Sequence, residues 1–168
     1  MNKLIPFCVM LALLTLTIMS TSSATCVYRS PEELIQLSDY VIHGIVKELN
    51  SHWTENHHWI YTLVTFEVLE VLKGELSDTS EVIIYMDGGK IGESQRGVSD
   101  QAVIEQGMEL IAHLMLLENG YFAIRGCEEG VYYIYDGNLK SISGKVDMTL
   151  DEFRKFLTKA MTNGEEGK

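Results

Sequence analysis

The chain has 168 residues, of which 46% are hydrophobic and 22% charged, and its 24 acidic and 13 basic residues give a net charge of −11. An acidic chain repels nucleic acid and anionic lipid, so composition argues against both as electrostatic partners. The length suits one domain with its own hydrophobic core.

Residues 1–24 have the pattern of a cleavable export signal. Lys3 supplies a positive start, a mostly apolar stretch follows, and Ser22 and Ala24 occupy the −3 and −1 positions of a signal-peptidase site. A retained membrane anchor is the alternative, but the apolar run is short and small polar residues follow it. We therefore expect a secreted or periplasmic protein with no membrane association after cleavage. Its mature chain keeps 12 basic and 24 acidic residues, a net charge of −12.

The mature chain keeps two cysteines, Cys26 and Cys127, because Cys8 leaves with the signal. Two cysteines in an exported chain most simply form a disulfide, with two free thiols as the alternative. The bond would close a loop of about 100 residues, worth roughly 4–5 kcal/mol in the chain-entropy model. Without a C-x-x-C spacing, a zinc site built on these cysteines is not expected.

A short helix is predicted to follow Ser30, because Ser30 and Glu33 form a capping box around Pro31, and it should end near Ser38. From Asp39 onwards the hydrophobic period changes to two, which predicts strands. We expect the first three strands at 40–51, 59–72 and 81–86.

The second of these strands contains a change of phase. Its even positions from Ile60 to Val68 form one face, but Glu70 takes the next even position while Leu69 and Val71 become the apolar pair. Such a flip predicts a β-bulge or a bend, the feature that lets a sheet curl into a barrel.

The rest of the chain reads as a long polar loop over 90–106, more short strands and a second helix. Asn119-Gly120 is a hairpin turn signal, and Thr149 with Glu152 forms a capping box that opens the helix. These elements predict a mainly β fold, a small five- to six-stranded OB-like barrel with a short N-terminal helix and a C-terminal helix. The single domain should cover 25–162, with a disordered tail over 163–168. The later strands are expected at 110–117, 121–125 and 131–135.

Two phrases of the chain resemble those of a known family. The run S-P-E-E-L-I-Q-L-S-D-Y-V-I-H-G-I-V (30–46) is followed by I-Y-T-L-V-T-F-E-V-L-E-V-L-K-G (60–74). They resemble the N-terminal domain of the tissue inhibitors of metalloproteinases and the related netrin modules, and also look like phrases of uncharacterised exported bacterial proteins. The likeness covers roughly Cys26 to Tyr135 and implies an OB-fold with a protein-binding role.

In those inhibitors the first mature residue is a cysteine whose amino group and carbonyl chelate the protease zinc. The resemblance places Cys26 on the second cysteine of that family and Cys127 near its late-strand partner. Ala24, the last signal residue, stands where the chelating cysteine would be. The mature chain should begin at Thr25, so Thr25 and Cys26 are the residues that would meet a partner; cleavage after Thr25 would instead leave Cys26 first.

The segment 52–59, H-W-T-E-N-H-H-W, joins the first two predicted strands. The corresponding loop of the inhibitors helps to contact the protease, so Trp53 and Trp59 are candidate anchors for a partner. The loop also has the residue types of a transition-metal site, against the simpler interpretation of a solvated loop. The candidate ligands are His52, His57 and His58.

No catalytic residue is predicted. His43 and His113 lie singly within expected strands, where packing explains them, and neither Gly-x-Ser-x-Gly nor His-Glu-x-x-His occurs. We expect a monomeric, non-enzymatic, protein-binding module without a cofactor, whose partner is a secreted protein or metalloprotease and whose protease inhibition is weak. The alternatives are a structural or envelope-associated protein and a metal-binding protein that uses the histidine loop.

Overall fold

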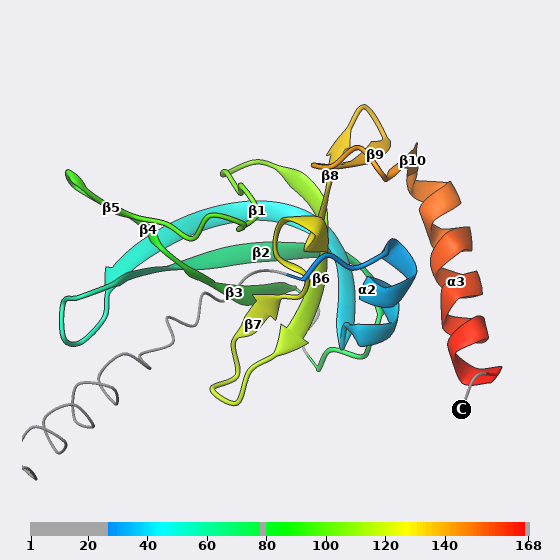
Figure 1. Cartoon of the computed structure of the whole chain (residues 1–168), viewed down its shortest axis with the longest axis horizontal. Helices are drawn as coiled ribbons and strands as arrows, with labels where there is room; N and C mark the ends of the chain where they lie inside the picture. The colour runs from blue at the N-terminus through cyan, green and yellow to red at the C-terminus, as the bar shows by residue number, and fades with distance from the viewer. Residues whose placement is uncertain (1–26, 78–79, 167–168) are drawn as a thin grey trace, which may run out of the picture.

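A computed structural model describes residues 27–77 and 80–166, so the expected signal, Thr25 and Cys26 lie outside the described residues. None of the described helices is both long and apolar enough to cross a bilayer. In chain order the elements are α2 (Pro31–Leu37), β1 (Tyr40–Trp53), β2 (Ile60–Lys73), β3 (Glu81–Asp87), β4 (Gly89–Ile91), β5 (Ser94–Arg96), β6 (Glu109–Leu116), β7 (Phe122–Ile124), the 3₁₀ turn η1 (Cys127–Gly130), β8 (Val131–Tyr135), β9 (Asn138–Ser141), β10 (Asp147–Thr149) and α3 (Leu150–Glu166) (Figure 1).

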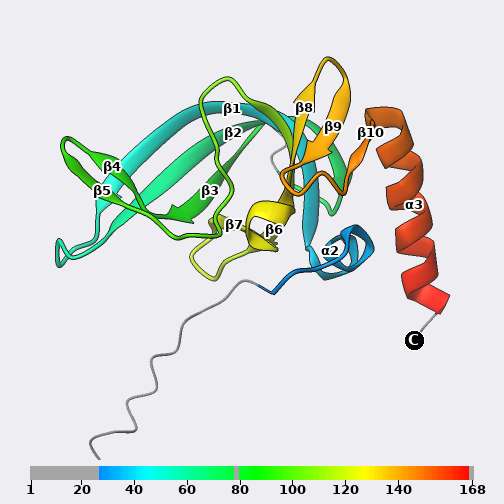
Figure 2. The same cartoon turned by 45° about the horizontal axis from the view of Figure 1, so that its top comes forward.

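Five strands close into a barrel in the order β1-β2-β3-β7-β6, because β6 pairs back onto β1. Neighbouring barrel strands are antiparallel except β3 and β7, which meet in parallel at Ile84 and Phe122. The predicted OB-like barrel is therefore confirmed. In Figures 1 and 2 the hairpin of β1 and β2 runs beyond the barrel to one end of the described chain, with the β4–β5 hairpin beside it.

The predicted bulge lies where the hydrophobic phase flips. His43 pairs with Glu70 and the next residue, Gly44, pairs with Val68, so Leu69 is the extra residue of β2. A Cβ on Gly44 would lie 2.1 Å from the carbonyl oxygen of Glu67, so only glycine fits where the strand coils this tightly. With this bulge, β1 keeps pairing with β2 along one edge and pairs with β6 along the other edge over residues 40–45.

The barrel interior is filled by the alternating apolar residues of its strands. Val64 and Phe66 of β2 and Leu110 and Leu114 of β6 are fully buried, as the sequence pattern predicts. Val68, expected in the same core, is partly buried and packs against it. The strand β6 is buried on both faces, since a second core lies outside the barrel.

That second core forms between the barrel wall and the two helices. Phe153 and Leu157 of α3 pack with Ile35 of α2, Ile111 of β6 and Tyr132 of β8. Both predicted capping boxes are present: Glu33 N–H donates to Ser30 Oγ, and Glu152 N–H donates to Thr149 Oγ1. The helices therefore cover one outer face of the barrel with an apolar layer of their own.

The side chain of Lys73, at the end of β2, fixes α2 to the barrel. Lys73 Nζ donates to the carbonyl oxygens of Ile35 and Ser38, at 2.6 Å each, and so satisfies the end of the helix. Burial lowers the pKa of Lys73, and nearby Asp39 opposes that shift. Because these contacts are internal, Lys73 has a structural role at this position.

Three features differ from the sequence prediction. The expected loop 90–106 contains the β4–β5 hairpin, which turns at Gly92 with φ of +58°. The last predicted strand, 131–135, does not end the sheet: Asp136 and Gly137, with φ of +50° and +78°, turn the chain into β9, and β10 then pairs with β9. The helix α3 runs to Glu166, past the start of the predicted tail. The strands that the sequence did not predict, β4, β5, β9 and β10, are three or four residues long and mostly polar, so hydrophobic periodicity could not reveal them.

Candidate functional site

The turn between β1 and β2 is rigid because its side chains hydrogen-bond to its own backbone. Thr54 Oγ1 donates to Asn56 Oδ1 at 2.8 Å and accepts from the N–H of Trp59 at 3.1 Å. Asn56 Oδ1 also accepts from the N–H of His58 at 3.1 Å. His57 has a φ of +54°, in the left-handed region that these bonds hold in place. The tip is therefore pre-organised rather than a loose loop.

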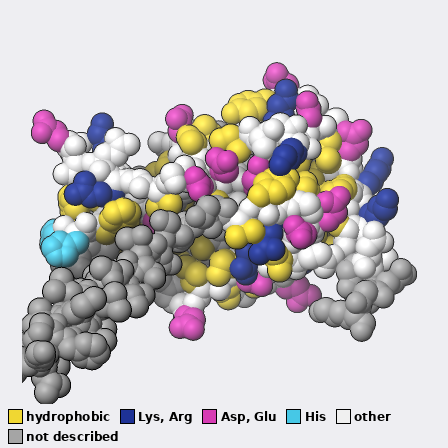
Figure 3. Space-filling model, viewed as in Figure 1, with side chains coloured by type: hydrophobic (Ala, Val, Ile, Leu, Met, Phe, Trp, Pro, Cys, Tyr) yellow, Lys and Arg dark blue, Asp and Glu magenta, His cyan; other side chains and the backbone are white. Residues whose placement is uncertain are grey.

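Aromatic side chains surround this turn on the described residues of β1, β2 and β3. The indole of Trp53 lies 6.1 Å from the ring of His57, centroid to centroid. Tyr61 stands between two other rings, stacking on His52 at 5.5 Å and on Tyr85 at 5.3 Å. Figure 3 shows histidine side chains gathered at this end of the molecule beside hydrophobic ones. The tip thus presents an aromatic surface built from two separate groups of rings, Trp53 with His57 and His52 with Tyr61 and Tyr85.

Trp59 completes the exposed part of this surface. Its side chain is 37% exposed, a large fraction for a tryptophan, while Ile60 beside it is fully buried. Exposed tryptophans are costly to keep in water and are favoured at interface hot spots. The two tryptophans that the sequence predicts as anchors therefore flank one ordered turn.

A shallow depression lies against the aromatic tip. It is lined by Trp53, Thr54, Glu55, Asn56, His57, Tyr61 and Tyr85. The hydroxyl of Tyr85 donates to Asp87 Oδ1 at 3.2 Å. Burial, and then the negative charge of Asp87, raise the pKa of Tyr85, so the phenol stays protonated at neutral pH.

The candidate metal ligands of the 52–59 loop do not converge. His52 stacks on Tyr61 and His57 packs beside Trp53, so these two rings are engaged in separate aromatic contacts. Across the residues that the structure describes, no group of three or more His, Cys, Asp and Glu side chains is placed to hold a metal ion.

The N-terminal contact predicted from the family resemblance cannot be placed, because Thr25 and Cys26 lie outside the described residues. The first described residues lie beside the middle of the barrel in both views, away from the tip (Figures 1 and 2). Cys127 opens η1 with a φ of +55°. Its pairing with Cys26 stays a prediction.

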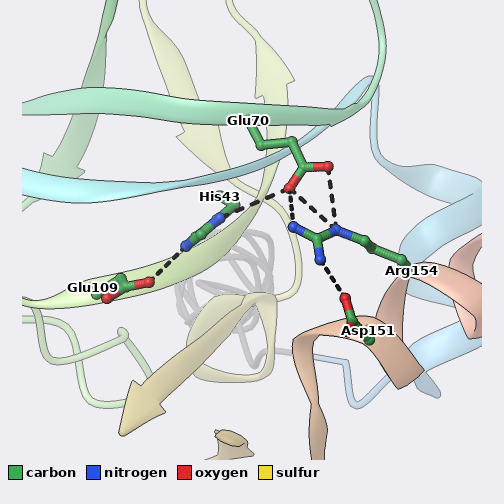
Figure 4. A network of polar contacts seen from close by, with 5 residues as sticks. All are labelled: His43, Glu70, Glu109, Asp151 and Arg154. Carbon is green, nitrogen blue, oxygen red and sulfur yellow. Dashed lines mark hydrogen bonds and ion pairs between the residues drawn. The ribbon is translucent and has the colours of Figure 1, made fainter. Parts of the chain in front are cut away.

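His43 lies in a network of polar contacts that joins four other side chains (Figure 4). Its Nε2 is 2.8 Å from Glu109 Oε1, and its Nδ1 is 3.9 Å from Glu70 Oε2. Arg154 of α3 holds both oxygens of Glu70 and also contacts Asp151. The two carboxylates flank opposite nitrogens of the imidazole, so they cannot share one ion with it. The network instead ties α3 to three barrel strands.

His113 is fully buried between the barrel and the helices, as expected for a core residue. Its Nδ1 is 3.4 Å from Ser38 Oγ, and its ring meets the edge of Tyr132 at 5.0 Å between centroids. Burial, with a smaller effect from the charge of Lys73, lowers the pKa of His113 to about 3. A neutral imidazole enclosed in this way has no route to a substrate, so its role is structural.

Sequence reasoning missed Tyr61, Tyr85 and Asp87 as part of the site. Each alternates with buried residues of β2 or β3 and therefore projects from the outer face of the sheet. The signal was available as two tyrosines at outward-facing positions, but bringing them together requires the register between the strands, in which Tyr85 pairs with Leu63.

Neither the comparison with protein-family models nor the comparison with curated proteins finds a match to the chain. The site must therefore be interpreted from its own geometry.

Proposed function

We propose that this chain is an exported, non-enzymatic binding module that contacts a secreted protein through the tip of the β1–β2 hairpin. The observation that carries the proposal is the ordered aromatic turn, with Trp53 and Trp59 on either side of a backbone fixed by Thr54 and Asn56. A pre-organised aromatic surface loses little entropy on binding, which is what interface anchors require. The netrin-like phrases support the same role for this loop.

Thr25 and Cys26 are a second proposed contact, carried only by the family resemblance. In that family, tight inhibition needs the amine and carbonyl of a first cysteine, and here Thr25 is expected to come first. Ordering a terminus with only one disulfide beside it costs affinity. We therefore propose that inhibition of zinc proteases by this protein is weak. Nanomolar inhibition that is lost on adding one residue before Thr25, yet unaffected by Trp53→Ala, would contradict this.

The binding role is tested with a matched pair of surface variants. The secreted protein is immobilised and exposed to the secreted proteins of the cell that produces it, with Trp59→Ala and Tyr135→Ala as the two variants. Tyr135 is a suitable control because it is 58% exposed on β8, outside the tip. We expect proteins captured by the wild type to be lost with Trp59→Ala and kept with Tyr135→Ala.

Capture that is equal for both variants, or capture lost equally with both, would overturn the assignment to the tip. No specific capture by the wild type would favour the structural or envelope-associated alternative. Zinc-dependent capture that disappears with a chelator and with His57→Ala would favour the metal-binding alternative.

A further inference from the structure

We propose that the depression beside the tip binds a cationic side chain, a guanidinium or ammonium group, presented by the protein partner. The inference rests on the proposed function, because it names the chemical group that the partner presents to the same surface. It follows from the aromatic walls of the depression, its charges and its rigidity.

The walls of the depression are aromatic, because Trp53, Tyr61 and Tyr85 contribute to its lining. Tyr61 is stacked between His52 and Tyr85, so its faces are covered, which leaves Trp53 and Tyr85 as the rings that can accept a cation. A cation within about 6 Å of such rings is attracted by their quadrupoles, by about 0.5–1 kcal/mol at an exposed site. Tryptophan is the strongest of these acceptors.

The charges around the depression have one sign. Glu55 belongs to the lining, Asp87 lies at hydrogen-bond distance from Tyr85, and among the described lining residues there is no Lys or Arg. Lys90 and Arg96 belong to the β4–β5 hairpin.

That hairpin packs on the opposite face of the sheet. A Cβ on Gly89 would lie 2.3 Å from Thr62 Oγ1 and 3.2 Å from Ile60 Cγ2, and both Thr62 and Ile60 are buried on the inner side of β2. Tyr61, between them in the sequence, projects to the outer side. The outer surface is therefore complementary to a cation, and an anionic group would meet the two carboxylates.

The positions of the polar groups suit a long basic side chain better than a purely apolar one. Glu55 and Asn56 are exposed at the rim, and Asn56 is fixed by Thr54 and His58. An Arg or Lys can lay its methylene stem on the rings while its charged end meets a carboxylate at the rim. An apolar side chain would leave that carboxylate without a new partner.

The experiment uses intrinsic fluorescence, because the chain has two tryptophans and both flank this turn. The mature protein is titrated with N-acetyl-L-arginine amide and, in parallel, with the neutral isostere N-acetyl-L-citrulline amide. Measurements at pH 8 keep ordinary imidazoles neutral. We expect the arginine probe to change the emission at about two- to fivefold lower concentration than the citrulline probe.

Two variants locate the effect. Glu55→Gln removes one charge at the rim without changing side-chain size and should weaken the arginine response by about two- to fivefold. Glu118→Gln, the same change at an exposed position in the β6–β7 loop, should leave it unchanged. Because both positions are exposed, neither change should alter the fold, which circular dichroism checks.

Equal responses to the two probes, or a response that Glu55→Gln leaves unchanged, would overturn the inference. Its failure is distinct from failure of the proposed function. If the arginine probe fails while capture still depends on Trp59, the tip remains the binding surface and its partner group is not a cation. If capture does not depend on Trp59, the proposed function itself fails.

Discussion

The two ends of this molecule place aromatic residues in opposite environments. At the α3 end, Phe153 and Tyr132 are buried in a second core, their ring centroids 5.5 Å apart. At the hairpin end, Trp59 lies partly in solvent and the stacked rings of Tyr61 and Tyr85 lie on the outer face of the sheet. The first arrangement is enclosed in the core, whereas the second leaves aromatic side chains in contact with solvent, where a partner can reach them. This contrast is why the tip, and not the larger polar network around His43, is the candidate for binding.

The polar groups follow the same division. At the α3 end they close on one another: Glu70 is held by Arg154, His43 by Glu109, and Lys73 by the carbonyls of α2. At the tip, Thr54 and Asn56 bond the turn to itself and leave the neighbouring rings accessible. Variants at the α3 end should therefore change stability without changing binding, and variants at the tip should do the reverse.

The largest effect is expected from Phe153→Ala. Phe153 is fully buried between α3, β8 and β6, so truncation leaves a cavity and should lower the free energy of unfolding by about 3–5 kcal/mol. Urea denaturation gives this value, while capture by the tip should persist under conditions where the variant is folded. A loss below about 1 kcal/mol would mean that the second core contributes little.

Replacing Cys127 by serine tests the predicted disulfide. If Cys26 and Cys127 are paired, Cys127→Ser should lower the free energy of unfolding by about 2–5 kcal/mol, because the unfolded chain gains freedom. Cys26→Ser should give the same loss, and the wild-type mass should lie two hydrogens below its reduced value. An unchanged melting temperature, or two thiols that alkylate without a reductant, would exclude the pairing.

His113 should make stability depend on pH. Its pKa is lowered to about 3 by burial in the folded protein, against about 6.5 in the unfolded chain. The unfolded chain therefore binds more protons below pH 6.5, and stability falls as the pH drops from 6.5 towards 3, by at most about 1.4 kcal/mol per pH unit.

Above pH 6.5 this contribution is constant. The check is to plot the free energy of unfolding against pH between pH 5 and 6.5 for the wild type and for His113→Leu. The variant replaces the imidazole by an apolar side chain that does not titrate. The slope should flatten in the variant. An equal slope in both proteins would show that another group accounts for the pH dependence.

The smallest effect is expected from Arg154→Ala. The ion pair of Arg154 with Glu70 is partly exposed, 40% and 37% for the two side chains, so solvent screens it and its loss should lower the melting temperature only slightly. Thermal unfolding at low and high salt measures it, and the difference between variant and wild type should shrink at high salt. A large loss of stability that does not depend on salt would instead indicate lost packing of the arginine stem.

Much of the fold could be predicted because it depends on neighbours in the sequence. Ser30 with Glu33 and Thr149 with Glu152 mark the starts of the helices, and the phase flip at Leu69 marks the bulge. The alternating apolar positions of β2 likewise predict that Val64 and Phe66 are buried in the barrel core.

The tryptophans of the site could be predicted from the sequence, but the tyrosines beside them could not. Trp53 and Trp59 stand out within one short segment of sequence, whereas the stacking of Tyr61 on Tyr85 depends on the register between two strands. The contact of His43 with Glu109 joins residues 66 positions apart. The β4–β5 hairpin was missed since its strands are short and polar, with no hydrophobic period to read.

The most direct test of the contrast between the two ends is an oxidative footprint of the mature protein, free and bound to a captured partner, read by mass spectrometry. If the tip is the binding surface, Trp53, Trp59 and Tyr85 should be protected in the complex, while the exposed Tyr135 should be oxidised equally in both states. Protection of Tyr135 with unchanged oxidation of both tryptophans would contradict the account.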